Sequence, residues 1–571
     1  MSMLMRGKGV LRAAGLAMAV LATGLLSAAD RAPADRLVPG GVSVFVRVSD
    51  VPKTKEDWKK SALGKLWDSS EMAEFRKEVE AKWEETVSEA AESKFPAKEL
   101  LSLPQGEIAL AILQEDGGPI GAVLLLEYGD KQAELDKALD ALDKSLEEEE
   151  ATKSTDTVAG TEITVFSFKD KNDDEVPYKL AYCTKEGCVL FGSSTSILEG
   201  VLGRWDGKDS DCLAEDEIYG YIQQKSRLDS SKAAAMDYFV SPIDLVRGIL
   251  ASDEKLALQG VIFNTYLQSL GLGQLKGIGG SGEIARGDFD SWGRTVIYAD
   301  QPAKGVMKVF QFPVKRLAVP GWVDESVAQF SSFHWDAAGA WNGISAVGDA
   351  IMGKPGNFAV TIDKLSKQPP NVHIKKDVID QLAGDVMVVS NGVELTDSGT
   401  PQEKQVIMLE LKNESKVKEL IDRLTAMVPQ IEKREFKGTD IYDIPGNGQM
   451  SPSLAVANGL LLFSTNSPAI EAVLRTTTAD KPLSDSADFK ALTKGVPEDV
   501  SFFTFSRLDK TIEALYATAR GGDFDAFTEG KIDLKTLPEF ETIRKYFRPQ
   551  FSFAVPDENG AVIENYSLPL K

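Results

Sequence analysis

One short pattern occurs twice in the chain, and this repeat constrains the fold more than any other feature. Residues 189–202 read VLFGSSTSILEGVL, and residues 461–474 read LLFSTNSPAIEAVL. Phe191 corresponds to Phe463, and Glu199 corresponds to Glu471. An apolar run, a cluster of small polar residues and apolar residues at helical spacing are typical of a strand, a tight turn and an amphipathic helix. The chain therefore contains this unit in two copies.

Further segments recur in the same order and extend the repeat over most of the chain. The matching pairs are residues 106–111 with 384–389, 160–163 with 438–441, and 238–244 with 503–509. Each copy closes with two strand-like segments, at 277–286 and 294–299 in the first copy and at 549–556 and 561–568 in the second. We therefore predict an α+β fold with two tandem homologous domains, residues 36–303 and 304–571. Each is expected to be a curved antiparallel sheet packed with helices.

The segments between these landmarks give a coarse secondary structure. Residues 55–94 predict helices with breaks near 61–64 and 68–70, and Met72, Phe75, Val79, Trp83 and Val87 form one apolar stripe that we expect to pack into a core. A further helix is predicted at residues 131–149, and another begins at Pro242. Strands are predicted at residues 42–48, 107–113, 121–127, 161–168, 179–184, 188–192 and 235–241.

The first 29 residues have the pattern of a secretory signal peptide. Arg6, Lys8 and Arg12 precede an apolar run at residues 13–26, and the small residues at 27–29 form a cleavage site. Cleavage there would change the net charge from −23 to −26, because the segment holds three basic and no acidic residues. The apolar run is short for a membrane span. We therefore expect an exported protein, in the periplasm, the cell envelope or the extracellular space, with no integral membrane span after cleavage.

Composition and charge describe a folded protein and exclude some partners. With 43% hydrophobic and 26% charged residues, the chain has enough apolar surface to form cores. The net charge of −23 argues against nucleic acid and anionic membranes as partners, since both are bound by clustered Lys and Arg. An envelope protein or an apolar small molecule remains open as a partner.

The chain has three cysteines, Cys183, Cys188 and Cys212. Residues 182–188 read YCTKEGC, a pattern that predicts a hairpin with Cys183 and Cys188 across from each other. In an oxidising compartment these two thiols can close a disulfide. The second copy has Ala457 and Leu460 in this neighbourhood, so the fold does not require a bridge. The sequence leaves both states open.

Three segments also resemble a known family. Residues 36–39 (RLVP) with the strand that follows, residues 61–67 (SALGKLW) and residues 331–336 (SSFHWD) resemble a family of large exported bacterial proteins that contain a domain of unknown function. The resemblance covers most of the mature chain. It implies export and an internal duplication, and it assigns no role to any residue.

Motifs that could carry chemistry are incomplete. Residues 277–282 (GIGGSG) match a dinucleotide-binding loop, but they follow a helix and enter a strand, so we expect a glycine-rich bulge at a strand start. Residues 170–175 are acidic like a calcium loop but carry Glu175 where glycine is required. Asp206, Asp209 and Asp211 form a second acidic loop, and we expect solvated acids in both, with weak cation binding as the alternative.

The histidines and the hydroxyl-rich turns, which are the remaining candidates for a functional site, are also best explained by structural roles. His334 and His373 are the only histidines; neither has a catalytic or zinc motif, and His334 is expected to be a packed or edge residue between Phe333 and Trp335. The hydroxyl-rich turns of the repeat could bind an anion, but helix capping explains them equally, with Ser196 and Glu199 as a capping box. We assign no catalytic, cofactor-binding or metal-binding residue.

The functional expectation is an exported, non-enzymatic protein that binds or scaffolds in the cell envelope or periplasm. The alternatives are a carrier of an apolar ligand held between sheet and helices and, third, a carboxylate-dependent hydrolase. An interaction protein should expose an apolar patch. A carrier needs a large dry cavity, and a hydrolase needs acids that converge in a cleft.

Overall fold

The computed structural model describes residues 31–89, 102–114, 120–148, 150–168, 179–229, 233–252, 256–395, 401–428, 430–446, 452–476, 478–521 and 532–570. The expected signal peptide and the acidic loop at residues 170–175 lie outside these ranges.

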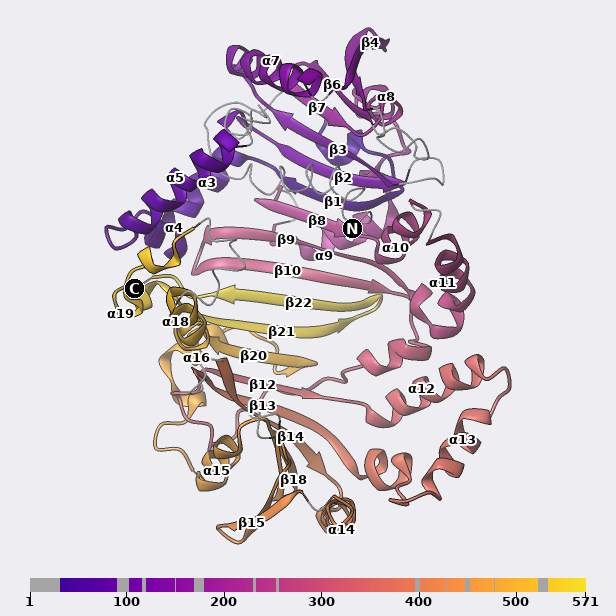
Figure 1. Cartoon of the computed structure of the whole chain (residues 1–571), viewed down its shortest axis with the longest axis vertical. Coiled ribbons are helices and arrows are strands. Elements are labelled where there is room, and N and C mark those ends of the chain that lie inside the picture. Colours follow the sequence, from indigo (N-terminus) through magenta and orange to yellow (C-terminus); the bar gives the residue numbers. More distant parts are fainter. Residues whose placement is uncertain are drawn as a thin grey trace.

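Twenty strands of the described residues form one antiparallel sheet (Figure 1). From one edge to the centre they are β4 (Thr152–Val158), β5 (Thr161–Ser167), β6 (Lys179–Lys185), β7 (Cys188–Gly192), β3 (Ile120–Glu127), β2 (Ile108–Gln114), β1 (Val42–Val48), β8 (Met236–Val240), β9 (Leu275–Arg286) and β10 (Phe289–Ala299). The sheet continues with β22 (Gly560–Ser567), β21 (Pro549–Asp557), β20 (Phe502–Arg507), β12 (Gln329–His334), β13 (Leu382–Leu395), β14 (Pro401–Leu411), β18 (Leu460–Ser464), β17 (Ser453–Ala457), β16 (Thr439–Asp443) and β15 (Glu432–Phe436). A separate short ladder joins β11 (Lys315–Arg316) to β19 (Asp499–Val500).

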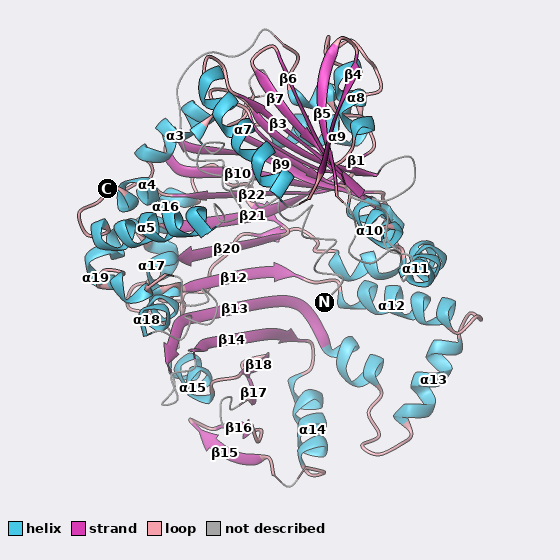
Figure 2. Cartoon of the chain, turned by 45° about the horizontal axis from the view of Figure 1, so that its top comes forward, coloured by secondary structure: helices cyan, strands magenta, loops and turns pink. Residues whose placement is uncertain are grey.

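The strand order is the same from either edge of the sheet. The two halves meet where β10 pairs with β22 over eight residue pairs, from Ser291 opposite Ser567 to Tyr298 opposite Gly560. The sheet twists along its length, so its end strands run at an angle to its central strands (Figure 2). The predicted mixture of helices with an antiparallel sheet is therefore confirmed. The strands form one continuous sheet, and the division at residue 303 stays a prediction.

Helices cover both faces of each half in equivalent positions. In the first half α2 (Ala34–Leu37), α8 (Thr195–Gly203) and α9 (Glu217–Ser226) pack on one face, and α7 (Gln132–Glu148) packs on the other. In the second half α15 (Ser467–Arg475) and α16 (Ala487–Leu492) pack on one face, and α14 (Glu414–Thr425) packs on the other. Phe45, Tyr219 and Phe239 fill the first core, and Phe330, Phe503 and Phe551 fill the second. Apolar side chains on both faces of these strands are thus covered by helices.

The remaining helices lie along the two flanks where the strands end. One flank carries α3 (Val51–Lys60), α4 (Ala62–Trp67), α5 (Ala73–Glu89), α17 (Leu508–Thr511), α18 (Glu513–Gly521) and α19 (Phe540–Ile543). The other carries α10 (Pro242–Ala251), α11 (Ala257–Leu270), α12 (Ala337–Ile351) and α13 (Asn357–Ser366), at the right of Figures 1 and 2.

The short helical turns are η1 (Leu213–Glu215), η3 (Leu272–Gln274), η4 (Gly305–Phe310), η5 (Ile374–Val378), η6 (Ile379–Gln381), η7 (Leu483–Asp485), η8 (Leu534–Thr536) and η9 (Arg544–Tyr546). Among them η4 packs against α12.

Most of the predicted elements form close to their expected bounds. The helix break near residue 61 is confirmed, because Ser61 ends α3 and caps α4 by accepting from the Gly64 amide. Pro242 occupies the start of α10, as predicted. Met72 of the apolar stripe is buried, whereas the side chains of Trp83 and Val87 lie outside the described set.

Candidate functional site

The repeated turns cap helices. The Ser194 hydroxyl accepts from the Ile197 amide at 3.3 Å, and the Asn466 side chain accepts from the Ala469 amide at 3.2 Å. The capping interpretation is confirmed, but the first cap is Ser194 and not Ser196, because the helix already begins at Thr195. The two turns belong to α8 and α15, which lie toward opposite ends of the molecule (Figure 1), so they do not share an anion-binding groove.

The glycine-rich segment 277–282 lies inside β9. It pairs regularly with β8 and β10, and the only irregularity of the β9–β10 ladder falls just before it, between Leu275 and Gly277. A Cβ at Gly279 would lie 2.6 Å from the Tyr238 carbonyl oxygen and 2.9 Å from the Ile222 side chain of α9. An irregularity at the strand start is therefore found as expected, but it lies just before the run of glycines and not within it. These glycines let α9 approach the sheet closely, as a dense core requires.

The charged loop residues are engaged in local ion pairs. Arg204 lies 3.2 Å from Asp211 and 3.6 Å from Asp209, and Lys208 lies 3.2 Å from Asp206. No group of three or more side chains suited to hold a metal occurs within the described ranges. The acidic loop at residues 206–211 therefore behaves as a set of solvated, paired acids.

His334 forms part of a half-buried polar cluster. Its Nδ1 lies 2.7 Å from Asp385, and Lys315 contacts the other oxygen of that carboxylate at 2.7 Å. Burial raises the pKa of Asp385, but hydrogen bonds from His334 and Lys315 outweigh it and hold the pKa below its ordinary value. The imidazole covers Gly384, where an added Cβ would approach it to 2.4 Å. His334 is thus a half-buried residue at the end of an interior strand, which pairs with both β13 and β20, and its hydrogen bond with Asp385 holds it in place; it is not an edge residue.

The cysteine hairpin forms, but its two thiols are not opposite each other. Cys183 lies opposite Leu190, and Cys188 lies opposite Lys185, so the two cysteines are diagonal neighbours. Diagonal residues of a ladder are about 7–8 Å apart, beyond the usual reach of a disulfide. The predicted placement of the two cysteines opposite each other is therefore wrong. Cys183, Cys188 and Cys212 are buried free thiols.

The burial of these thiols gives a prediction about their reactivity. Burial raises the pKa of Cys183 to about 12 and that of Cys188, beside Arg31, to about 11. Since the thiolate is the reactive form, iodoacetamide at pH 8 should label neither thiol in the folded protein and all three in urea, as counted by mass spectrometry. Because both folded pKa values exceed the ordinary value, stability should also fall as the pH rises from about 9 toward about 11. An oxidised pair in the native protein would contradict this prediction.

The most strongly buried charges form what we call the buried ion cluster. It consists of Arg31, Asp35, Arg47, Glu107, Glu127, Arg227 and Asp237. Arg47 of β1 contacts Asp237 of β8, and its other terminal nitrogen lies 3.2 Å from Asp35. Asp237 is fully inaccessible to solvent and also accepts from Ser281 and Arg227. Each carboxylate in the cluster therefore faces at least one guanidinium.

Arg31 ties the start of the described chain into this cluster. Its guanidinium lies 2.7 Å from Glu107 and 3.4 Å from Glu127, and its side chain is 3% exposed. Burial lowers the pKa of Arg31, but attraction to Glu107 outweighs that effect, so the pKa is raised and the side chain stays charged. The segment just after the expected cleavage site is thus an integral part of the fold. Four carboxylates sealed beneath arginines do not form an open catalytic cleft.

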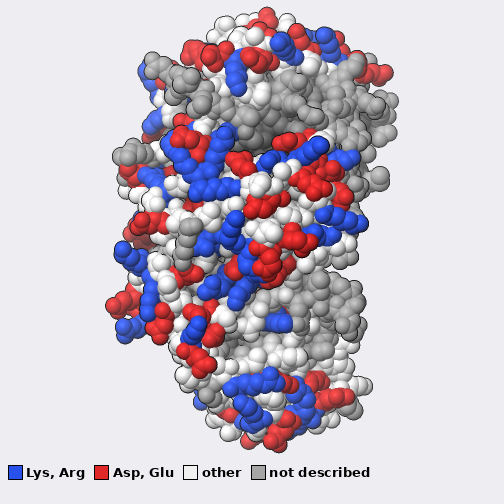
Figure 3. All heavy atoms as spheres, turned by 90° about the vertical axis from the view of Figure 1, so that its left-hand side faces the viewer, with Lys and Arg blue, Asp and Glu red and all other residues white. Residues whose placement is uncertain are grey.

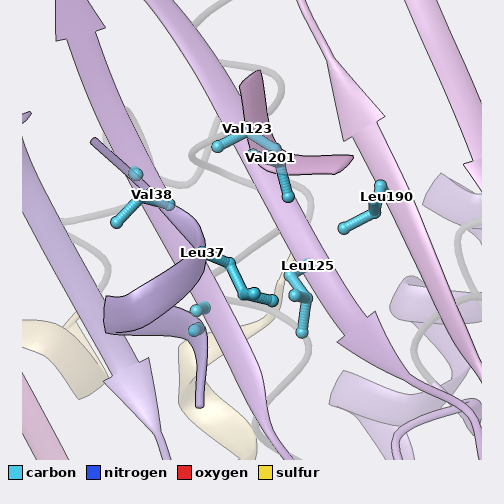
Figure 4. A pocket seen from close by; sticks show the side chains of 9 residues that line it. Leu37, Val38, Val123, Leu125, Leu190 and Val201 are labelled. Atoms are coloured by element: carbon cyan, nitrogen blue, oxygen red, sulfur yellow. The ribbon is translucent and has the colours of Figure 1, made fainter. Parts of the chain in front are cut away.

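Two cavities lie between helices and sheet in the described part of the chain, one small and one polar. A cavity enclosed by α2, α8 and the strands is lined by apolar side chains that include Leu37, Val123, Leu125 and Leu190, and its volume is about 10 Å³ (Figure 4). That volume holds about one water molecule. A second cavity, of about 270 Å³, lies between α9, α10, α11 and β9, and Asp216, Asp244, Arg247 and Lys276 share its lining with apolar residues. Neither cavity is a large dry pocket.

The most unusual surface is what we call the apolar flank, formed by exposed apolar side chains of α10, α11, η4, α12 and α13. Its members are Val246, Ile249, Leu258, Val261, Ile262, Tyr266, Phe310, Ile344, Ile351, Met352, Val360 and Leu365. These twelve are about half of the large apolar side chains exposed in the described part of the chain. The elements are neighbours, since α11 contacts α10, η4 and α12, and α12 contacts α13. The flank is therefore built from elements that adjoin one another.

α11 is the centre of the apolar flank. Residues 256–275 contain no charged side chain, although 26% of the whole chain is charged. Leu258 is 68% exposed and Val261 is 63% exposed, while Leu267 is the one fully buried apolar side chain of α11 that the structure describes. A helix with no charged residue and with apolar residues on several sides is normally buried in a core or a membrane. α13 has no buried residue at all. Among the described residues, the exposed apolar side chains of these two helices are left uncovered.

The opposite flank has the usual appearance of a soluble surface. Seen from that side, it carries Lys, Arg, Asp and Glu side chains over its whole height (Figure 3). Exposed apolar residues such as Trp58, Leu63 and Leu515 also occur on this flank, but fewer of them than on the apolar flank. Apolar periodicity does not reveal the apolar flank, because it identifies only helices with one polar and one apolar face. The signal that could have revealed it is the charge-free run at residues 256–275.

Comparison with known proteins gives no assignment. No family model matches the chain, and neither does a curated protein or a solved structure. Within the described ranges, no helix combines the length and apolar character that crossing a membrane requires.

Proposed function

We propose that this chain is an exported, non-enzymatic binding or scaffolding protein of the cell envelope or periplasm, which docks its partner on the apolar flank. The signal-peptide pattern of residues 1–29 supports export. The apolar flank carries the proposal, because monomeric soluble proteins rarely leave a large continuous apolar surface uncovered.

We also infer that the two halves are tandem copies of one α+β unit. The supporting observations are the repeated sequence segments, the identical strand order from both edges and the equivalent positions of α7 with α14 and of α8 with α15. In this proposal α10 and α11 of the first copy and α12 and α13 of the second copy together build the docking surface.

The other candidate functions receive less support. A carrier of a lipid-like ligand needs a large apolar cavity, whereas the apolar cavity described above measures about 10 Å³ and the cavity of about 270 Å³ has four charged residues in its lining. A carboxylate-dependent hydrolase needs acids that reach a bound substrate, whereas Glu107, Glu127 and Asp237 are buried against arginines.

The proposal predicts that the apolar flank holds the exported protein at the envelope. In a bacterial host that exports the chain, wild type should sediment with the envelope fraction, and the double variant Leu258→Glu/Val261→Glu should move to the soluble fraction. The shift should be at least about tenfold, because two apolar side chains would no longer be buried in the complex. Quantitative immunoblots of the fractions provide the measurement.

Leu515→Glu is the matched control, since Leu515 is 49% exposed on α18 of the opposite flank. This variant should fractionate like wild type. Equal distribution of all three proteins would show that the apolar flank has no docking role.

A further inference from the structure

We propose that the partner of the apolar flank is a lipid bilayer that carries anionic headgroups, and that the protein lies on this surface through α11, α12 and α13. This inference rests on the proposed function, because it names the partner of the same surface. Three observations support it: the composition of the helices, the charge of the flank and the repulsion expected between two copies of the flank.

The helices have the composition of elements that lie in a membrane interface. Interfacial helices place apolar side chains about 5–10 Å into the boundary between headgroups and acyl chains. α11 offers Leu258, Val261, Ile262 and Tyr266 without a single charged residue to desolvate. With 14 residues it is shorter than the about 20 that a spanning helix needs, so it suits the plane of the interface. Tyr266 adds an aromatic ring with a polar tip, which favours the headgroup level.

The helical segments that form the apolar flank have a net charge opposite in sign to that of the whole chain. Residues 242–251, 257–270 and 304–310 together with residues 337–366 contain five basic and three acidic side chains, a net charge of +2, whereas the chain carries −23. The five basic residues are Arg247, Lys304, Lys308, Lys354 and Lys364. The expectation drawn from net charge, that anionic membranes are excluded, therefore does not apply to this surface.

The lysines of the apolar flank are available to a ligand. Lys304, Lys308, Lys354 and Lys364 form no ion pair with any described residue. The three acids are already engaged: Asp349 accepts from the amides of Gly356 and Phe358, Asp363 pairs with Lys367 at 2.8 Å, and Asp244 pairs with Arg247 at 3.2 Å. Unpaired cations beside exposed apolar side chains match an anionic bilayer, which supplies both contacts at once.

The same charges disfavour a second copy of the chain as the occupant. In a two-fold dimer each partner presents the same patch, so two flanks of net charge +2 would face each other. Like charges brought together in this way oppose association. A bilayer has no such conflict.

The test measures binding of the purified mature protein to sedimented vesicles. Two compositions are compared, phosphatidylcholine alone and phosphatidylcholine with about one third phosphatidylglycerol. Wild type should bind the anionic vesicles at least about tenfold more strongly than the neutral ones, and about 0.5 M salt should remove most of this difference. Lys308→Gln/Lys354→Gln/Lys364→Gln should lose the preference, and Leu258→Glu/Val261→Glu should lose binding to both compositions.

Controls separate this inference from the proposed function. All substituted side chains are at least partly exposed, and matching circular dichroism melts would show that the variants fold; Leu515→Glu should bind like wild type. Wild type that ignores both vesicles, or binds them regardless of the α11 substitutions, would overturn the inference. If the envelope fractionation still depends on Leu258 and Val261 in that case, the proposed function stands with a protein partner. A concentration-dependent dimer abolished by the α11 substitutions would instead identify a second copy as the occupant and overturn the lipid assignment.

Discussion

Replacing Arg47 with methionine should destabilise the protein by about 3–5 kcal/mol, because it removes one partner from a buried ion pair. The Arg47 side chain is 4% exposed, and its guanidinium faces Asp237, Asp35 and Glu107. Without it, these carboxylates stay buried beside fewer guanidinium groups. Burial lowers the pKa of Arg47, but attraction to Asp35 and Asp237 outweighs this effect, so the net pKa lies above its ordinary value. The arginine is therefore charged at every working pH. Urea unfolding followed by tryptophan fluorescence measures the loss.

Arg434→Met is the matched control for this prediction. Arg434 also contacts two carboxylates, Asp443 at 2.6 Å and Glu471 at 2.7 Å, but its side chain is 36% exposed. Water can solvate the carboxylates left behind, so this variant should lose no more than about 1 kcal/mol. If both variants lose the same free energy of unfolding, the burial of Arg47 does not determine how much its ion pairs contribute to stability.

The second half of the sheet explains why charges are not required at the Arg47 position. Phe45 lies opposite Phe239 in the first half, and Phe330 lies opposite Phe505 in the second. Two residues farther along, Arg47 faces Asp237 in the first half, whereas Ser332 faces Phe503 in the second. The same backbone thus accepts either a buried ion pair or an aromatic contact. The ion pair is a feature of one half, and it makes that half sensitive to the loss of a single partner.

Local patterns in the sequence predicted most of the central strands, but not their order in the sheet. Strands such as β2 and β3 have continuous apolar runs because helices cover both faces, and that signal lies within a few residues. β4 was missed because its residues TKSTDTV are almost wholly exposed and carry no apolar alternation. Its pairing with β5 depends on the neighbouring strand. Exposed hairpins of this kind have no hydrophobic pattern to detect.

The buried ion cluster and the apolar flank escaped prediction for a different reason. Arg47 and Asp237 are 190 residues apart, so nothing near Arg47 indicates that it is buried. α11 was missed because periodicity identifies helices with one apolar face, and this helix has apolar residues on several sides. Both features depend on what surrounds a segment in the folded protein, and that information is not local.

The junction between the halves is likewise set by tertiary structure. The sequence predicted the hairpins β9–β10 and β21–β22, and both form. It gave no sign that β10 and β22 pair with each other, because each strand already had a partner within its own hairpin. Eight residue pairs and the ion pair of Arg294 with Glu564 at 2.7 Å join the halves there. Neither strand is an edge in the whole chain, and this leads to the last prediction.

The isolated first half, residues 31–303, should self-associate when produced alone. Its strand β10 would become a free edge of 11 residues, and a long unpaired edge strand invites pairing with another chain. Because β10 and β22 hold equivalent places in the strand order, β10 of a second copy can stand in for β22. Analytical ultracentrifugation of the isolated half should therefore show dimers or larger species. The whole chain at the same concentration should not associate through β10, because β22 already covers that strand.

Thr295→Lys separates edge pairing from general misfolding. Thr295 is partly exposed in β10, where it lies opposite Ile563, and a lysine on an edge strand discourages edge-to-edge pairing. The isolated half with this change should remain monomeric, and the whole chain with the same change should lose no more than about 1 kcal/mol. A monomeric isolated half without the lysine would show that the β10 edge is protected by other means. An unfolded half would show instead that the first copy depends on β22 for its stability, so that the continuous sheet, and not the single copy, is the folding unit.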